Sequence, residues 1–296
     1  MQKLQKIRIA TEWFATCAGC EIALLDLGEK LIDLFEKCEI VYSPLVDAKE
    51  IPNNVDLALI SGAVRNEEER EKAKELRERS KTLIALGSCA CFGGVPGLAN
   101  LFENRELFEK VYMKTKSTVN PEKVVPAEDV PAFEDRVYSL DQVVKVDYCL
   151  PGCPPPTDMI AEALFNLLSG KKPALSKKNV CDECPLERKE KKIERIKRPT
   201  EGVPDPKKCL LDQGYICLGP ATRAGCGAAC INVRMPCRGC LGPTDKVLEQ
   251  GAKMISAIAS VLEVDEEEIV KMVYDPLGMF YRFSLPSSII RRKVKR

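Results

Sequence analysis

The residues of this sequence best suited to chemistry are its 15 cysteines, which occur without a single histidine. Many stand two to four positions apart, and thiolates at such intervals bind zinc or iron-sulfur clusters. Disulfides are a third use of cysteines, but the N-terminus lacks the apolar run and cleavage site of an export signal. We therefore expect a cytoplasmic protein whose thiols stay reduced and are free to bind metal.

Twelve of the cysteines form three sets of four when they are grouped by spacing and by the strands that they follow. The first quartet contains Cys17, Cys20, Cys89 and Cys153. The second contains Cys181, Cys184, Cys209 and Cys217. The third contains Cys226, Cys230, Cys237 and Cys240. Of the others, Cys38 is expected to be a buried apolar residue, whereas Cys91 and Cys149 lie close to proposed ligands and are the alternatives to them.

Alternating strands and helices must position the first quartet. Residues 1–168 are expected to form an α/β domain with helices on both faces of a parallel sheet, whose strands lie at 6–10, 39–42, 55–60, 82–86 and 143–148. Helices are expected at 21–35, at 66–79 with Asn66 as the cap, and at 157–168. The first-quartet cysteines follow three of these strands, so the carboxyl edge of the sheet should gather them.

Residues 169–296 are expected to form a second, irregular domain with helices. The stretch 181–240 holds eight cysteines with little apolar periodicity, so metal binding must supply stability that hydrophobic burial does not. A further helix is expected from Thr244, with Thr244 as its cap and Ile255 and Ile258 on its apolar face.

Composition argues against several functions. The net charge of +1 gives no general attraction to nucleic acid or acidic lipid. No stretch reaches the roughly 18 apolar residues of a membrane span. Without histidine there is no conventional pair of nucleophile and base, so we expect no catalytic residue in this chain. Gly93, Gly94 and Gly97 make no nucleotide-binding motif and should permit close approach to a cluster or to another subunit.

The ligand chemistry favours clusters over zinc. The first quartet comes from widely separated strand ends, unlike the compact paired knuckles of structural zinc sites. Sites made only of cysteine favour [4Fe-4S] clusters that carry single electrons. A zinc-stabilised interaction module without redox function is the alternative from a different class.

Five motifs together resemble the small, electron-transferring subunit of [NiFe] hydrogenases. They are CAGCE at 17–21, GSCA at 87–90, PGCPP at 151–155, CLGPAT at 217–222 and PCRGC at 236–240. The resemblance spans roughly residues 5–245 and is strongest to the cytoplasmic methanogen branch, the viologen-reducing, factor-420-non-reducing hydrogenase. A cluster subunit of another quinone, ferredoxin or deazaflavin oxidoreductase is the alternative within the same class.

The resemblance assigns a role to each quartet. It implies a flavodoxin-like N-terminal domain in which the first quartet holds a proximal cluster, facing a nickel-iron centre that lies only in a partner large subunit. The third quartet would hold the medial cluster and the second the distal cluster. Electrons from H2 would pass to an acceptor iron-sulfur subunit and towards heterodisulfide reductase.

Two departures from the periplasmic members of this family bear on the cluster types. A histidine commonly stands there in place of Cys181, and the medial cluster often has three irons because a proline stands in place of Cys230. Both changes in this chain add a thiolate, so the resemblance implies three [4Fe-4S] clusters. The twin-arginine signal of periplasmic members is also missing, which is consistent with a cytoplasmic enzyme.

Overall fold

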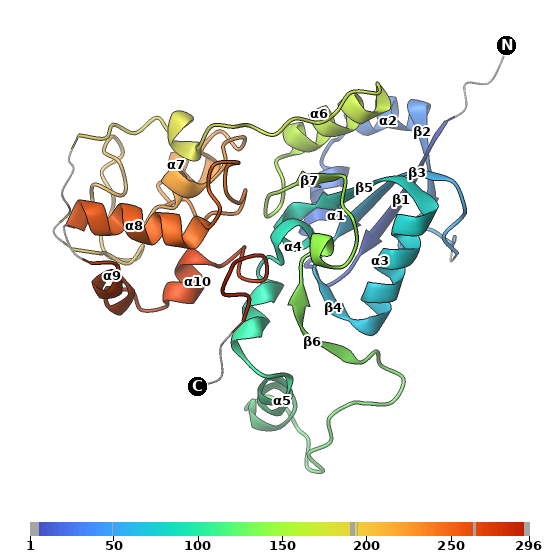
Figure 1. The fold of residues 1–296 in the computed structure, drawn as a ribbon, viewed down its shortest axis with the longest axis horizontal. Helices are drawn as coiled ribbons and strands as arrows, with labels where there is room; N and C mark the ends of the chain where they lie inside the picture. Colours follow the sequence, from blue (N-terminus) through green and yellow to red (C-terminus); the bar gives the residue numbers. More distant parts are fainter. Residues whose placement is uncertain (1–5, 49, 190–192, 194, 263–264, 293–296) are drawn as a thin grey trace.

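The N-terminal half of the chain is built on a five-stranded parallel sheet (Figure 1). The computed structural model describes residues 6–48, 50–189, 193, 195–262 and 265–292. The strands of the sheet are β1 (Ile7–Trp13), β2 (Cys38–Tyr42), β3 (Val55–Ser61), β5 (Ser80–Leu86) and β7 (Tyr148–Leu150). Their order, β2-β1-β3-β5-β7, is the flavodoxin-like order, so the predicted fold class is confirmed.

An apolar core lies on each face of the sheet, because successive side chains of a strand point to opposite faces. Leu57 and Leu59 of β3 belong to the core on one face, and Ala58 and Ile60 belong to the core on the other. The first core is covered by α1 (Gly19–Leu25), α2 (Lys30–Lys37) and α6 (Thr157–Leu168). The second is covered by α3 (Glu67–Arg79) and α4 (Gly87–Phe92). Burial on both faces explains why β3 is almost continuously apolar.

Two predicted elements of this half differ from the structure. The helix expected at 21–35 is two helices, α1 and α2, separated by a turn in which Gly28 has a φ of +59°. A left-handed residue cannot continue a right-handed helix, and glycine adopts that conformation at least cost. The strand expected at 143–148 is the shorter β7, because the chain forms a 3-10 turn at Leu140–Gln142 and joins the sheet later.

Helix α3 begins at the predicted cap. The Asn66 side chain accepts the Glu69 N–H at 2.9 Å, and the Glu69 carboxylate accepts the Asn66 N–H at 3.1 Å, which completes a capping box. Replacing Asn66 with alanine should lower the free energy of unfolding by about 1 kcal/mol, because one helix-terminal N–H loses its partner. Denaturant titration measures this, with Lys74→Ala as the control because its ion pair to Glu71 is exposed. Equal effects of the two variants would contradict the role of the cap.

Residues 96–138 contain structure that the sequence did not predict. A second, two-stranded sheet pairs β4 (Val64–Asn66) with β6 (Phe133–Tyr138) in antiparallel fashion. The stretch from residue 96 to the start of β6 also forms α5 (Asn104–Phe108) and short turns of 3-10 and π-helix. This part extends from the main sheet in Figure 1.

The C-terminal half is irregular around the cysteines and helical after them. Its helices are α7 (Ala229–Asn232), α8 (Gln250–Leu262), α9 (Glu266–Met272) and α10 (Pro276–Phe280). The predicted cap at Thr244 is wrong, since α8 begins only at Gln250. Between Thr244 and Gln250, the side chain of Asp245 forms an ion pair with Arg223 at 2.6 Å. This ion pair holds residues 244–249 outside the helix.

The end of the described chain returns to the N-terminal half. Added Cβ atoms on Gly93 and Gly97 would overlap the ring of Pro286, and the Gln142 side chain donates to the Pro286 carbonyl at 2.8 Å. These two glycines therefore admit a segment of the same chain, where a cluster or another subunit was expected.

The division of the chain into two domains at residue 168 stays a prediction.

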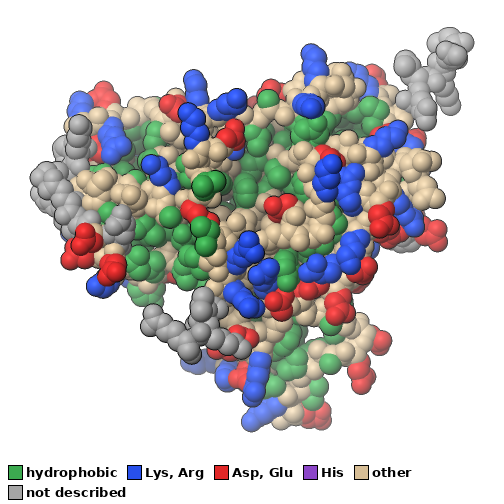
Figure 2. Space-filling model, in the orientation of Figure 1, with side chains coloured by type: hydrophobic (Ala, Val, Ile, Leu, Met, Phe, Trp, Pro, Cys, Tyr) green, Lys and Arg blue, Asp and Glu red, His purple; other side chains and the backbone are tan. Residues whose placement is uncertain are grey.

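The surface has no strong bias of charge. Basic and acidic side chains are interspersed over the face shown in Figure 2, in keeping with the net charge of +1. Within the described residues, no helix combines the length and apolar character needed to cross a membrane.

Candidate cluster-binding sites

The structure brings the four thiols of the first quartet together at the carboxyl edge of the sheet. Burial, with added repulsion from Glu21 and from the other three thiolates, raises the pKa of Cys20 to about 12. Burial and the charges of Cys153 and Cys17 likewise raise the pKa of Cys89 to about 12. Such thiols keep their protons at neutral pH unless a metal replaces them, which is how metal binding couples to protonation.

Two glycines make room for these sulfur atoms. A Cβ on Gly87 would overlap the Cys20 Sγ, and a Cβ on Gly94 would come within 2.5 Å of the Cys89 Sγ. Both glycines have positive φ, at +83° and +56°, so other residues would also strain the backbone. The donor set and the space beside it fit a thiolate-bound iron-sulfur cluster.

The second quartet is also assembled. Burial and the charges of Cys217, Cys209 and Cys184 raise the pKa of Cys181 to about 12. Burial raises the pKa of Cys217 to about 11, although the N–H of Gly219 donates to its sulfur. An added Cβ on Gly219 would lie 3.3 Å from the Cys181 Sγ and 3.6 Å from the Cys217 Sγ. The absence of a side chain at this position again leaves space beside the thiols.

The third quartet is centred on the loop that follows α7. Burial raises the pKa of Cys240 to about 11, and the charges of Cys226 and Cys230 contribute to the increase. Burial also raises the pKa of Cys237, with a contribution from Cys217 of the neighbouring second quartet and a smaller one from Cys240. All four members of this quartet therefore lie near one another.

Hydrogen bonds join the quartets in a row. The hydroxyl of Ser88, which directly precedes Cys89 of the first quartet, donates to the carbonyl of Cys240 in the third. The N–H of Cys237, in the third quartet, donates to the Sγ of Cys217 in the second at 3.4 Å. The spatial order is therefore first, third, second, which differs from the order in the sequence.

Among the residues that the structure describes, no three Cys, Asp or Glu side chains are arranged as a site for one metal ion. The thiols of each quartet nevertheless lie near enough for their charges to act on one another. A [4Fe-4S] cluster binds each of its four thiolates at a different iron, so four neighbouring thiols are the donor set that it needs. The assignment of individual ligands stays a prediction.

The remaining cysteines lie in the cores of the sheet domain. Cys38 is 1% exposed. The Cys91 thiol donates its one proton to the Ala85 carbonyl at 3.3 Å, and its sulfur interacts with the Cys149 thiol. Burial raises the pKa of Cys91, with contributions from Cys149 and from the charge of Cys20, whereas the interaction with Cys91 lowers the pKa of Cys149. The two alternative ligands thus contact each other within an apolar core.

Replacing both Cys91 and Cys149 with alanine should leave the iron content of the chain unchanged, because each thiol interacts more strongly with the other than with any quartet thiol. Iron analysis of the anaerobically purified protein measures this. Loss of about four irons per chain would move one of the two into the ligand set.

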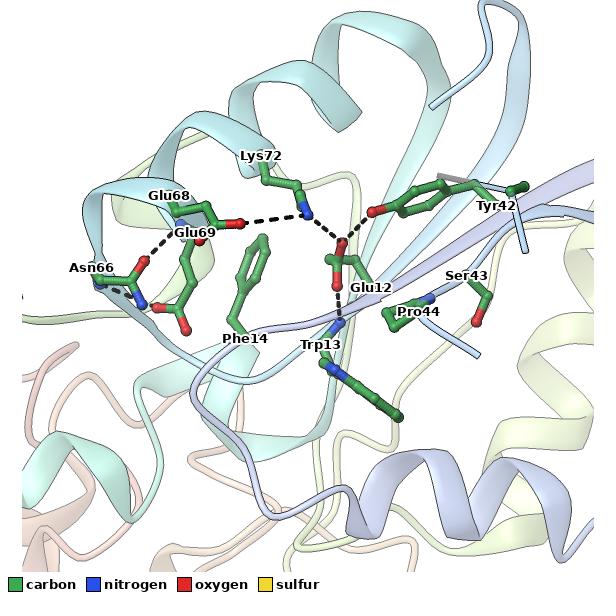
Figure 3. A pocket seen from close by; sticks show the side chains of 11 residues that line it. Glu12, Trp13, Phe14, Tyr42, Ser43, Pro44, Asn66, Glu68, Glu69 and Lys72 are labelled. Atoms are coloured by element: carbon green, nitrogen blue, oxygen red, sulfur yellow. Dashed lines mark hydrogen bonds and ion pairs between the residues drawn. The ribbon is translucent and has the colours of Figure 1, made fainter. Parts of the chain in front are cut away.

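A pocket of about 380 Å³ lies at the carboxyl ends of β1 and β2 (Figure 3). The buried Glu12 carboxylate accepts the Tyr42 hydroxyl at 2.6 Å and the Trp13 N–H at 2.9 Å, and it lies 3.5 Å from Lys72 Nζ. Burial and the bond to Glu12 raise the pKa of Tyr42, so Tyr42 stays a donor. The carboxylate is thus satisfied within the chain, and the described lining residues include no cysteine.

Sequence reasoning missed two residues beside the cysteines. Glu21 directly follows Cys20 in the first motif, and its charge raises the pKa of that thiol. Ser88 directly precedes Cys89 in the second motif and is 1% exposed. Their places within the motifs were visible in the sequence, but their contacts depend on the folded chain.

Known proteins are similar to this chain in sequence and in fold. A family described as NADH ubiquinone oxidoreductase, 20 Kd subunit, matches residues 17–167, which places the sheet domain in a class of oxidoreductase subunits. A crystal structure of an NAD+-reducing [NiFe]-hydrogenase in the H2-reduced state contains a similar chain, with a TM-score of 0.55 and 36% identity. The similarity covers 57% of this chain and 95% of that chain.

Two relatives are similar over almost the whole chain. A subunit of the F420-non-reducing hydrogenase of Methanothermobacter thermautotrophicus is 45% identical, covering 99% of this chain and 98% of the relative. The corresponding vhu subunit of the F420-non-reducing hydrogenase of Methanocaldococcus jannaschii is 46% identical, covering 94% and 95%. The chain therefore belongs to this family of F420-non-reducing hydrogenase subunits, as the motifs predicted.

Proposed function

We propose that this chain is the electron-transfer subunit of a cytoplasmic [NiFe] hydrogenase, carrying electrons from H2 oxidation through three [4Fe-4S] clusters to an acceptor iron-sulfur subunit. The observation that carries the proposal is the row of three cysteine quartets, in which hydrogen bonds link the first to the third and the third to the second. The hydrogenase names of the relatives support H2 as the source of electrons. Heterodisulfide reductase is the proposed destination, and the nickel-iron centre would lie in the large subunit.

The proposed clusters supply one-electron chemistry when they are bound. The chain's own residues hold them and tune them. Buried thiolates provide the ligands, and backbone N–H groups such as those of Val95 and Gly219 donate to the sulfurs. Hydrogen bonds to sulfur and restricted solvent access are the means by which a protein sets a cluster's potential.

The surface beside the first quartet supports a large partner subunit. Helix α1 carries Cys20 and exposes two large apolar side chains, Ile22 at 56% and Leu25 at 59%. Apolar side chains that are neighbours on an exposed helix favour coverage by another protein. We propose that the large subunit docks over α1 and the first quartet.

Anaerobic purification of the tagged chain from its source tests the proposal. We expect a nickel-containing subunit to co-purify and the complex to reduce viologen dyes with H2. Reduction by a quinol, ferredoxin or deazaflavin without H2 activity would favour the alternative oxidoreductase. A colourless protein that contains zinc would favour the interaction module.

A further inference from the structure

The contact between the first and third quartets depends on a buried hydroxyl. Ser88 is 1% exposed and lies in the first turn of α4, directly before Cys89. Its N–H donates to the Gly152 carbonyl at 2.8 Å, and the Gly152 N–H donates to the Ser88 Oγ at 3.2 Å. Ser88 therefore binds together the two loops that carry Cys89 and Cys153.

The same hydroxyl reaches the third quartet. The Ser88 Oγ donates its proton to the carbonyl of Cys240. The thiol of Cys240 lies near Cys153, which directly follows Gly152, since both the backbone and the charge of Cys153 act on the pKa of Cys240. Ser88 thus holds the backbone of Cys240 against two loops of the first quartet.

We propose that Ser88 is a positioning residue for electron transfer between the first and third quartets, because its hydroxyl holds the Cys240 loop against the loops that carry Cys89 and Cys153. The inference rests on the proposed function and names a residue that sets how the two sites meet. Backbone N–H groups beside a cluster stabilise its more electron-rich, reduced state and so raise its potential. Without the hydroxyl, the Cys240 loop is free to move away from the loops of the first quartet and from their N–H groups.

The test is an EPR-monitored redox titration of the anaerobically purified complex carrying Ser88→Ala. We expect the redox equilibrium of one of the three clusters to shift about tenfold towards its oxidised form. This shift corresponds to a reduction potential that is lower by about 59 mV for one electron. The other two couples should stay within about threefold of the wild type, and Ser88→Thr, which keeps the hydroxyl, should restore the shifted couple.

Ser80→Ala is the matched control. Ser80 lies at the opposite end of β5, and its buried Oγ has no hydrogen-bond partner in the described part of the chain. An unshifted titration of Ser88→Ala, or equal shifts of all three couples, would overturn the proposal. If Ser88→Ala does not assemble, pulsed EPR of the wild type after exchange into D2O provides a second test. A slowly exchanging deuteron coupled to the third-quartet cluster supports the proposal, and its absence overturns it.

Iron content distinguishes a failure of the proposed function from a failure of the proposed role of Ser88. Wild-type protein without iron would overturn the proposed function and this inference together. Wild-type iron content in Ser88→Ala with unchanged potentials would overturn the role of Ser88 alone.

Discussion

Replacing Cys89 with alanine should lower the iron content from about twelve to about eight atoms per chain and stop electron transfer from H2 to the acceptor. The half-buried thiol lies beside those of Cys153 and Cys17 at the edge of the sheet, so its loss removes one corner of the first site. If this site is the entry point for electrons, the other two quartets cannot replace it. Iron analysis and H2-dependent dye reduction by the purified complex measure the two effects.

Cys38→Ala is the control for this substitution. Cys38 is a buried cysteine of the same domain and packs in the core formed by β1, β3 and α6. Its loss should leave about twelve irons and full electron transfer. Unchanged iron in Cys89→Ala, or equal losses in both variants, would contradict the assignment of the first quartet.

Replacing Cys230 with proline should convert the third-quartet cluster from a four-iron to a three-iron form. Cys230 is an exposed cysteine within α7, near the Cys240 thiol. Proline offers no thiolate, so one iron loses its protein ligand and is readily released. EPR spectroscopy of the oxidised protein should then detect a new paramagnetic signal.

Cys230→Ala separates the loss of the thiol from the effect of proline on the backbone. The alanine variant should give the same signal, because only the ligand matters. If neither variant gives it, Cys230 leaves the ligand set.

The sheet and the first quartet were largely predictable because they follow from local patterns. The apolar run of β3 predicted a doubly buried strand, and the positions of Cys89 and Cys153 after strands predicted their place at one edge. Asn66 likewise predicted the start of α3, since a helix cap needs only residues within one turn.

The parts that were missed depend on contacts between distant residues. The late start of α8 accompanies the ion pair of Asp245 with Arg223, more than twenty positions earlier. Ser88 reaches Cys240 across 152 positions of sequence. The 3.6-residue periodicity that predicts helices contains no information about such partners, so neither feature could be read from the sequence.

Anaerobic metal analysis of the chain, separated from its partners with its cofactors intact, tests whether it carries three iron-sulfur clusters. We expect about twelve iron atoms per chain, as three clusters of four, and no nickel. Zinc in place of iron would overturn the proposed function, and about eight irons would remove one of the three proposed clusters.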